Sequence, residues 1–205
     1  LLKLKTENMD AKEQKLLAKA LATLDEFYAK KAGRGTDLIK SHVPPAVAKL
    51  IGRGDADLHK HYKAKFLEQL TSRKKLGNDI YRAAALALGQ LVMPRETVKA
   101  DAIYSMGLLK FFENGKDAQA RYFSLLALGQ IGGDANKNAL MKVLARGNKA
   151  LERPWSALSL GVLNFKKFES DSHATVDRLV GDLLTKQLKE VKNPESRAAF
   201  AVALG

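Results

Sequence analysis

The chain has 205 residues, of which 46% are hydrophobic and 28% charged, an ordinary composition for a folded protein. Its formal net charge of +13 favours anionic partners. It has no cysteine, which excludes disulfides and thiolate chemistry. No apolar run approaches the roughly 20 residues that span a bilayer, so no transmembrane segment is expected.

The first quarter of the chain predicts helices that do not repeat clearly. Asp10 and Glu13 have the spacing of a capping box, and apolar residues at helical spacing follow as far as residue 31. A short helical turn is expected near residue 36. Pro44-Pro45 can begin a further helix, which ends near Gly52. We interpret residues 1–54 as an N-terminal cap or as degenerate helical repeats.

From residue 55 onward, segments with helical periodicity come in pairs. The predicted pairs are 55–75 with 78–92, 96–112 with 117–131, 136–145 with 151–163, and 172–191 with the segment after Pro194. No stretch shows the alternation and β-branched enrichment that are typical of strands. We therefore expect residues 55–205 to form helical hairpins that belong, with the cap, to one continuous domain.

The second segment of each pair repeats nearly the same sequence. Its four copies, at residues 81–89, 121–129, 153–161 and 197–205, each end in Leu-Gly. Self-similarity at a period of about 20–50 residues is typical of repeat arrays, in which each unit buries its apolar face against its neighbours. The closing glycine is expected either to allow close packing or to begin a turn. Because the chain starts at Leu1 and stops inside the fourth copy, both ends look truncated.

The repeated segment, with an acidic or polar residue, Arg, several Ala and then Leu-Gly, resembles the second helix of HEAT-like repeats. The likeness is to the short bacterial kind also seen in phycobilisome lyase-type proteins, and it covers about residues 55–205. It implies an all-α fold, an α-α superhelix (solenoid) of HEAT-like hairpins whose second helices line the concave face.

The same resemblance implies a structural role for the recurring arginines, which would join neighbouring repeats through acidic residues. The arginines are Arg82, Arg121, Arg153 and Arg197, and the candidate acidic partners are Asp79, Asp117, Glu152 and Glu195. A basic ladder that contacts a ligand is the alternative.

The chain departs from that family two residues before the repeated leucine, where the family usually has a polar residue. The residues at this position are Leu86, Leu126, Leu158 and Val202. Because two residues correspond to about 200° of helical rotation, the second helices are apolar on opposite sides. Either tight curvature buries this row, or the row forms an apolar groove for a partner. Phe123 and Trp155 hold equivalent positions in adjacent copies, as binding anchors or as ordinary core.

A basic cluster marks the first predicted helix after residue 55. Its members are Lys60, Lys63, Lys65, Arg73, Lys74 and Lys75. This cluster is a candidate contact for nucleic acid or for an acidic partner. Alternatively, it is a solvated helix face, since long lysine stems cover apolar surface and cations favour a helix C-terminus.

Catalytic motifs are absent from the sequence. His59 and His61 are two residues apart on a predicted helix, so they face different directions and cannot form a metal-binding pair. HEAT-repeat enzymes that hydroxylate a modified lysine use His-Glu pairs, and this chain has no His-Glu dipeptide. A glycine-rich phosphate loop and a nucleophile elbow are also missing. We therefore expect no catalytic residue, no metal site and no cofactor.

These patterns favour a non-catalytic protein–protein interaction scaffold, and the positive charge favours an acidic protein partner. Its expected contact residues on the concave face are Leu86, Phe123, Leu126, Trp155 and Leu158. The alternatives are a nucleic-acid binder, including a glycosylase for alkylated DNA bases as some HEAT-like proteins are, and a structural spacer within a larger protein. The pattern of residues defines neither the oligomeric state nor the compartment, which can be cytoplasmic or, after removal of a leader, exported.

Overall fold

The computed structural model describes residues 9–30, 35–72, 76–170, 173, 175 and 177–205. These residues form helices and connecting turns, without a strand among them, so the predicted all-α class is confirmed. The helices are α1 (Ala11–Ala29), α2 (Thr36–Lys40), α3 (Val43–Ile51), α4 (Asp57–Thr71), α5 (Asn78–Leu91), α6 (Ala102–Asn114), α7 (Ala118–Ile131), α8 (Asp134–Arg146), α9 (Glu152–Ser170), α10 (Arg178–Glu190) and α11 (Pro194–Leu204), with a 3₁₀ turn, η2 (Lys99–Asp101), before α6.

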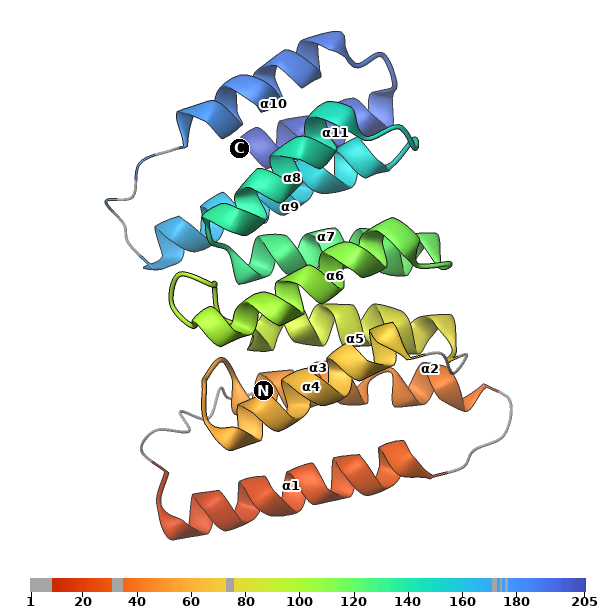
Figure 1. Cartoon of the computed structure of the whole chain (residues 1–205), viewed down its shortest axis with the longest axis vertical. Helices are drawn as coiled ribbons and strands as arrows, with labels where there is room; N and C mark the ends of the chain where they lie inside the picture. The colour runs from red at the N-terminus through yellow and green to blue at the C-terminus, as the bar shows by residue number, and fades with distance from the viewer. Residues whose placement is uncertain (1–8, 31–34, 73–75, 171–172, 174, 176) are drawn as a thin grey trace.

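The helices from α3 onward lie in two layers, with α4, α6, α8 and α10 in one and α3, α5, α7, α9 and α11 in the other (Figure 1). Each member of the first layer packs against the next helix of the chain: α4 on α5, α6 on α7, α8 on α9 and α10 on α11. In the second layer α3, α5, α7, α9 and α11 contact one another in that order. We call these five the second helices, because α5 to α11 are the second members of the predicted pairs.

Local sequence signals set most helix boundaries. The capping box at Asp10 and Glu13 is formed, with both reciprocal hydrogen bonds present. Asp117 caps α7 by accepting from the Ala120 amide at 2.7 Å. Gly132 and Gly133 separate α7 from α8 and have φ of +79° and +85°, a region that residues with a Cβ rarely adopt.

Three predicted boundaries are wrong. The segment expected to be helical from residue 96 begins with a turn, and α6 itself starts at Ala102. Helix α9 was expected to end near residue 163 but continues to Ser170, while α10 starts at Arg178 instead of residue 172. The chain therefore places seven more residues on α9 than its apolar pattern indicates (170 − 163 = 7), and three of them, Phe165, Phe168 and Glu169, are exposed.

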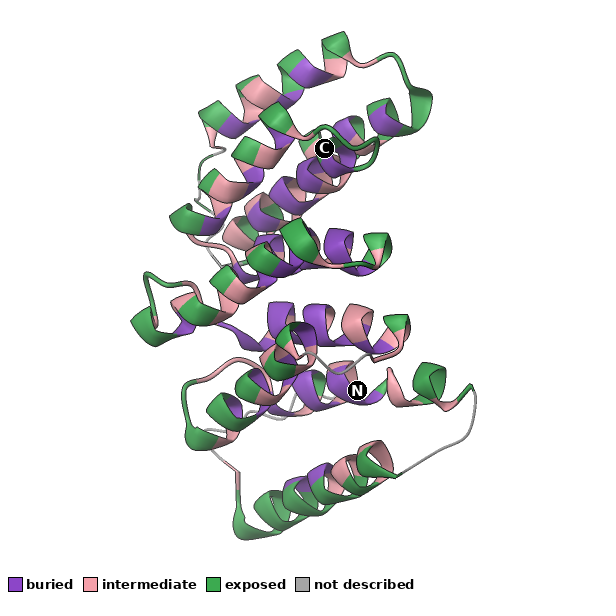
Figure 2. Cartoon of the chain, turned by 45° about the vertical axis from the view of Figure 1, so that its right-hand side comes forward, coloured by how far each residue is buried: buried purple, intermediate pink, exposed green. Residues whose placement is uncertain are grey.

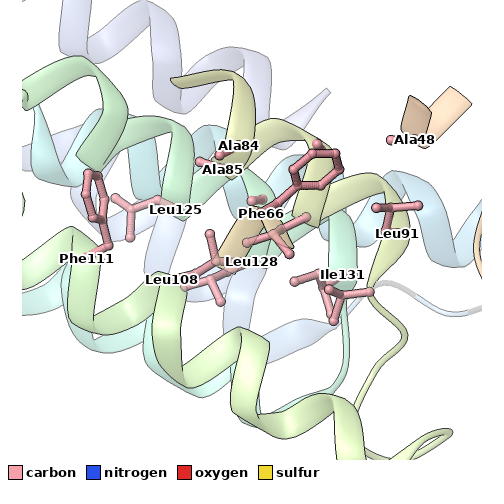
Figure 3. Close-up of a cluster of buried hydrophobic side chains, with 14 of the residues drawn as sticks. Ala48, Phe66, Ala84, Ala85, Leu91, Leu108, Phe111, Leu125, Leu128 and Ile131 are labelled. Carbon is pink, nitrogen blue, oxygen red and sulfur yellow. The ribbon is translucent and has the colours of Figure 1, made fainter. Parts of the chain in front are cut away.

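One cluster of buried hydrophobic side chains runs from α1 to α11 between the two layers. Phe66, Leu108 and Leu128 in Figure 3 show how residues from both layers meet in it. Figure 2 shows buried residues concentrated along the second helices, whereas most of α1 is exposed. Since each repeated leucine of the first three copies is at most 1% exposed, the Leu-Gly motif belongs to this core.

Neighbouring second helices approach closely at the repeated glycines. A Cβ placed on Gly129 would lie 2.2 Å from the backbone oxygen of Ser159 in α9, and one on Gly89 would lie 2.8 Å from Cα of Ala127 in α7. At Gly161 the nearest atom is Cα of Ala203 in α11, at 3.0 Å. The first three repeated glycines therefore act as close-packing points within helices rather than as the start of a turn.

Candidate interaction surface

The recurring arginines occupy the junctions between second helices. Arg82 of α5 donates from Nε and Nη2 to the two carboxylate oxygens of Asp117 at the start of α7, both at 3.0 Å. Arg121 of α7 donates to Glu152 at the start of α9, also at 3.0 Å. Each arginine thus joins its helix to the first turn of the next second helix, with partners that were among those expected for them.

The two later arginines use a different contact. Arg153 donates to the Gly147 carbonyl at 2.8 Å, and Arg197 to the Val191 carbonyl at 3.1 Å; both carbonyls end the preceding helix of the first layer. Among the described residues neither arginine pairs with a carboxylate, so the expected acidic partners are wrong for these two positions. Arg121 makes both kinds of contact, because it also donates to the Phe112 carbonyl at the end of α6.

The surface of the second helices that faces away from the first layer is apolar. We call it the open face, and its residues are Leu86 of α5, Phe123 and Leu126 of α7, Leu151 directly before α9, Trp155, Leu158, Val162 and Phe165 of α9, and Val202 of α11. Helix α9 shows its orientation clearly, because Ser156 donates to the Leu140 carbonyl of α8 whereas Leu158 lies about 200° away around the helix. The open face is the candidate functional site.

Helix α9, together with Leu151 directly before it, contributes an unbroken apolar stripe to the open face. Its five residues are spaced 4, 3, 4 and 3 positions apart, the spacing that keeps side chains on one side of a helix. Leu151 is 42% exposed and Phe165 is 64% exposed at the two ends of this stripe, and the three residues between them are half-buried. A stripe of this kind suits an apolar helix face or an extended apolar segment of a partner.

Phe123 and Trp155 contact each other across the junction between α7 and α9. Their rings meet edge to face with centroids 5.7 Å apart, and Tyr122 stacks on Trp155 with ring centroids 5.9 Å apart. Both Phe123 and Trp155 are half-buried and pack against the core. They therefore fill the space between two repeats and still present part of their surface, which combines the two interpretations that the sequence left open.

The row two residues before each repeated leucine is neither fully buried nor fully open. Leu86, Leu126 and Leu158 are half-buried, and Val202 at the end of the row is 70% exposed. The first three are therefore only partly covered by their neighbours. The structure thus keeps this row accessible along the second helices.

The predicted basic patch is not formed as expected. Lys63 is fully buried: it donates to Asp101 at 2.5 Å and to the Gly54 carbonyl at 2.8 Å, so its assignment to a surface patch is wrong. A buried ammonium needs such partners because its desolvation is costly. Lys65 pairs with Asp25 at 2.7 Å, and Lys60 remains exposed beside two aspartates. Residues 73–75, the remaining members, lie outside the described residues.

Arg53 has a structural role that the sequence did not indicate. Its guanidinium donates to the carbonyls of Gly89, Gln130 and Ile131, which lie at the C-terminal ends of α5 and α7. These carbonyls lack partners within their own helices and carry the negative end of the helix dipole. Burial lowers the pKa of Arg53, as expected for a cation removed from water. The position of Arg53, in a loop between two glycines, gave no sign of this contact.

Few features of the described part of the chain point to metal binding or catalysis. It contains no group of three or more His, Cys, Asp or Glu residues that could hold a metal ion. His59 is buried and contacts the Ile51 carbonyl at 3.2 Å through Nε2, which accounts for one of its two ring nitrogens. A cavity of about 120 Å³ lies where α9, α10 and α11 meet, beside Arg153, Glu190 and Phe200. Its size fits a few water molecules rather than a substrate.

Comparison with known proteins gives no family. No family model matches the sequence, and no curated protein matches it significantly. In the described part of the chain, no helix is long and apolar enough to cross a membrane. The open face and the charges around it are therefore the features from which a function can be inferred.

Proposed function

We propose that the chain is a HEAT-like solenoid and that it acts as a non-catalytic protein-interaction module, binding its partner on the open face. The observation that carries this proposal is the apolar stripe of α9, which is exposed at both ends and continues onto α7 and α11. Contiguous exposed apolar surface rimmed by polar residues is typical of binding sites. Trp155 and Phe123 would be the anchors, because partly exposed aromatic residues on a rigid helical layer contribute most to such interfaces.

The partner segment that fits best is an amphipathic helix with acidic residues on its polar side. Its apolar side would lie along α9, where the stripe repeats every three or four residues as the facing side of a helix does. The net charge of +13 favours an acidic partner and would speed association. Leu151 and Phe165 are fourteen positions apart, which at about 1.5 Å per position gives the stripe a length of about 21 Å, so the contact requires about four turns of the partner helix.

The nucleic-acid alternative has less support. Binding to phosphates needs several accessible Lys or Arg side chains on one surface. Of the residues assigned to such a patch, Lys63 is buried and Lys65 is paired with Asp25, and the open face itself is apolar. A labelled DNA duplex measured from about 50 to 300 mM salt separates the two functions, because phosphate contacts weaken steeply with salt.

The direct test changes the charge of the open face without touching the core. The double variant Leu151→Glu/Phe165→Glu replaces residues that are 42% and 64% exposed. Ile103→Glu/Met106→Glu is the matched control, because it adds the same charge at positions of α6 that are 59% and 69% exposed. We expect tagged wild type and control to capture the same partner from an extract of the source cells, and the open-face variant to lose it. Equal capture by all three proteins would refute the proposal.

A further inference from the structure

The junction between α9 and α11 lacks the ion pair that closes the two junctions before it. Arg82 of α5 donates to Asp117 at the start of α7, and Arg121 of α7 donates to Glu152 at the start of α9, each at 3.0 Å. Arg153 is their counterpart in α9, and it donates through Nε to a backbone carbonyl at 2.8 Å. Among the described residues it forms no ion pair, so its two terminal NH₂ groups have no carboxylate partner.

The helix that corresponds to α7 and α9 at this third junction is α11, and its first turn directs no carboxylate at the arginine. Asn193 is the N-cap of α11 and accepts from the Ser196 amide at 2.9 Å, as Asp117 accepts from an amide of α7 at 2.7 Å. An amide side chain therefore stands where the first junction has a carboxylate. Glu195, in the first turn of α11, is exposed and forms no ion pair within the described part of the chain.

The cavity of about 120 Å³ lies at this junction, where α9, α10 and α11 meet. Its lining includes Arg153, Ser196 and the buried Phe200. The volume corresponds to a few water molecules at about 30 Å³ each, so the cavity admits a group of the size of acetate and excludes a larger ligand. The guanidinium matches the two oxygens of a carboxylate, and Phe200 offers an apolar wall for the carbon that bears it.

Most charged side chains near the cavity are basic. Arg197 donates from Nη2 at 3.1 Å to the carbonyl of Val191, which also lines the cavity. Three exposed lysines adjoin lining residues in the sequence, namely Lys149, Lys189 and Lys192. Glu190 is an acidic member of the lining, but it is exposed, accepts from Gln187 at 3.3 Å and does not pair with Arg153. The surroundings thus favour an anionic occupant.

We propose that this cavity is a carboxylate-binding site, in which a ligand supplies to Arg153 the carboxylate that α11 does not provide. The bound carboxylate accepts from the terminal NH₂ groups of Arg153, and its carbon substituent faces Phe200. A group of this size ends both a short-chain carboxylic acid and an acidic side chain of a protein. Because Arg153 lies two residues before Trp155, and so about 200° around α9, the site is separate from the open face and does not rest on the proposed function.

Titration of the whole chain with sodium acetate, against sodium chloride at equal ionic strength, tests the site. We expect the amide resonance of Ser196 and the Nε–H resonance of Arg153 to shift saturably, with half-saturation at a concentration on the order of a few millimolar, because so small a ligand makes few contacts. N-acetylglutamate α-amide is the second ligand. Its binding identifies an acidic side chain of a partner as the occupant, whereas binding of acetate alone identifies a free small acid. No saturable shift with either ligand would overturn the proposal.

Three variants show whether the arginine and the junction make the site. Arg153→Gln should weaken acetate binding by about tenfold or more. Arg146→Gln is the matched control, because it removes an exposed arginine from the last turn of α8, and it should change binding by less than about twofold. Asn193→Asp keeps the cap and adds a carboxylate at the start of α11, so it should also weaken acetate binding by about tenfold. Equal binding by the two arginine variants, or undiminished binding by Asn193→Asp, would overturn the assignment.

Glu190→Gln separates a ligand site from an internal ion pair. Removal of a like charge from the lining should tighten acetate binding by about two- to threefold. If Glu190→Gln and Arg153→Gln instead lower Tm by the same amount, singly and together, then Glu190 is the partner of Arg153 in solution. That result would overturn the proposal.

Discussion

Gly129→Ala tests the claim that the second helices are stacked at contact distance through their glycines. The added Cβ would lie 2.2 Å from the backbone oxygen of Ser159 and 3.0 Å from its Cα. Ordinary contact distances are about 3.5 Å, so α7 and α9 must move apart by about 1 Å. Neither atom belongs to a flexible side chain, and the strain is therefore shared with the core on both sides of the junction.

The magnitude follows from two opposing effects. Ala is better than Gly in a helix by about 1 kcal/mol, whereas overpacking a core costs about 1–3 kcal/mol or more. With a backbone clash at the upper end of that range, we expect a net loss of about 2 kcal/mol at Gly129. For a chain of this size that corresponds to a fall in Tm of about 4–8 °C.

Gly181→Ala is the matched control, because Gly181 lies within α10 and a Cβ added there would have nothing within 4 Å. At that position only the helix preference acts, and we expect a gain of up to about 1 kcal/mol. Gly161→Ala, whose Cβ would be 3.0 Å from Ala203, should fall between the two. Urea unfolding followed by circular dichroism measures all three variants. A Gly129→Ala protein as stable as Gly181→Ala would refute the close stacking of α7 on α9.

Further predictions concern the buried and paired charges. Lys63→Met should cost about 3–5 kcal/mol in urea unfolding because it leaves a buried carboxylate unpaired, whereas the exposed pair lost in Lys60→Met should cost less than about 1 kcal/mol. The hydrogen bond from Arg82 lowers the pKa of Asp117, so the stability that this pair contributes is present above the unfolded pKa of about 4 and is lost as the pH falls below it. In a plot of Tm against pH, Asp117→Asn should therefore reduce the fall in Tm on the acid side. Burial raises the pKa of Tyr28 to about 12. The stability that the neutral phenol contributes is therefore complete below about pH 10 and is lost as the pH rises through about 12. The absorbance of the ionised phenol should accordingly appear at a higher pH for Tyr28 than for an exposed tyrosine.

Much of the fold follows from local signals in the sequence. Apolar periodicity, the glycine pairs and the prolines indicated the helical hairpins, because these residues act through the backbone of their own segment. The end of α9 was missed because residues 164–170 are mostly polar, and no local signal stops the helix before Ser170. The 4-3-4-3 spacing from Leu151 to Phe165 was the available sign that it continues.

The site was less predictable, because burial depends on contacts between distant residues. Lys63 has the sequence context of a surface lysine, and its partner Asp101 is 38 residues away in a turn before α6. The arginine contacts show the same limit, although the four positions are nearly equivalent in the sequence. Arg82 and Arg121 donate to carboxylates, whereas Arg153 and Arg197 donate to backbone carbonyls. Half-burial of Leu86, Leu126 and Leu158 likewise depends on how the repeats stack rather than on the residues themselves.

The most direct test of the open face as a binding surface is photo-crosslinking from single positions in source cells. A photoreactive phenylalanine analogue at position 165 replaces a residue that is 64% exposed on α9, and one at position 106 replaces a residue that is 69% exposed on α6. We predict that position 165 yields one discrete protein adduct that position 106 does not. Equal adducts from both positions, or adducts to nucleic acid alone, would contradict the assignment of the open face.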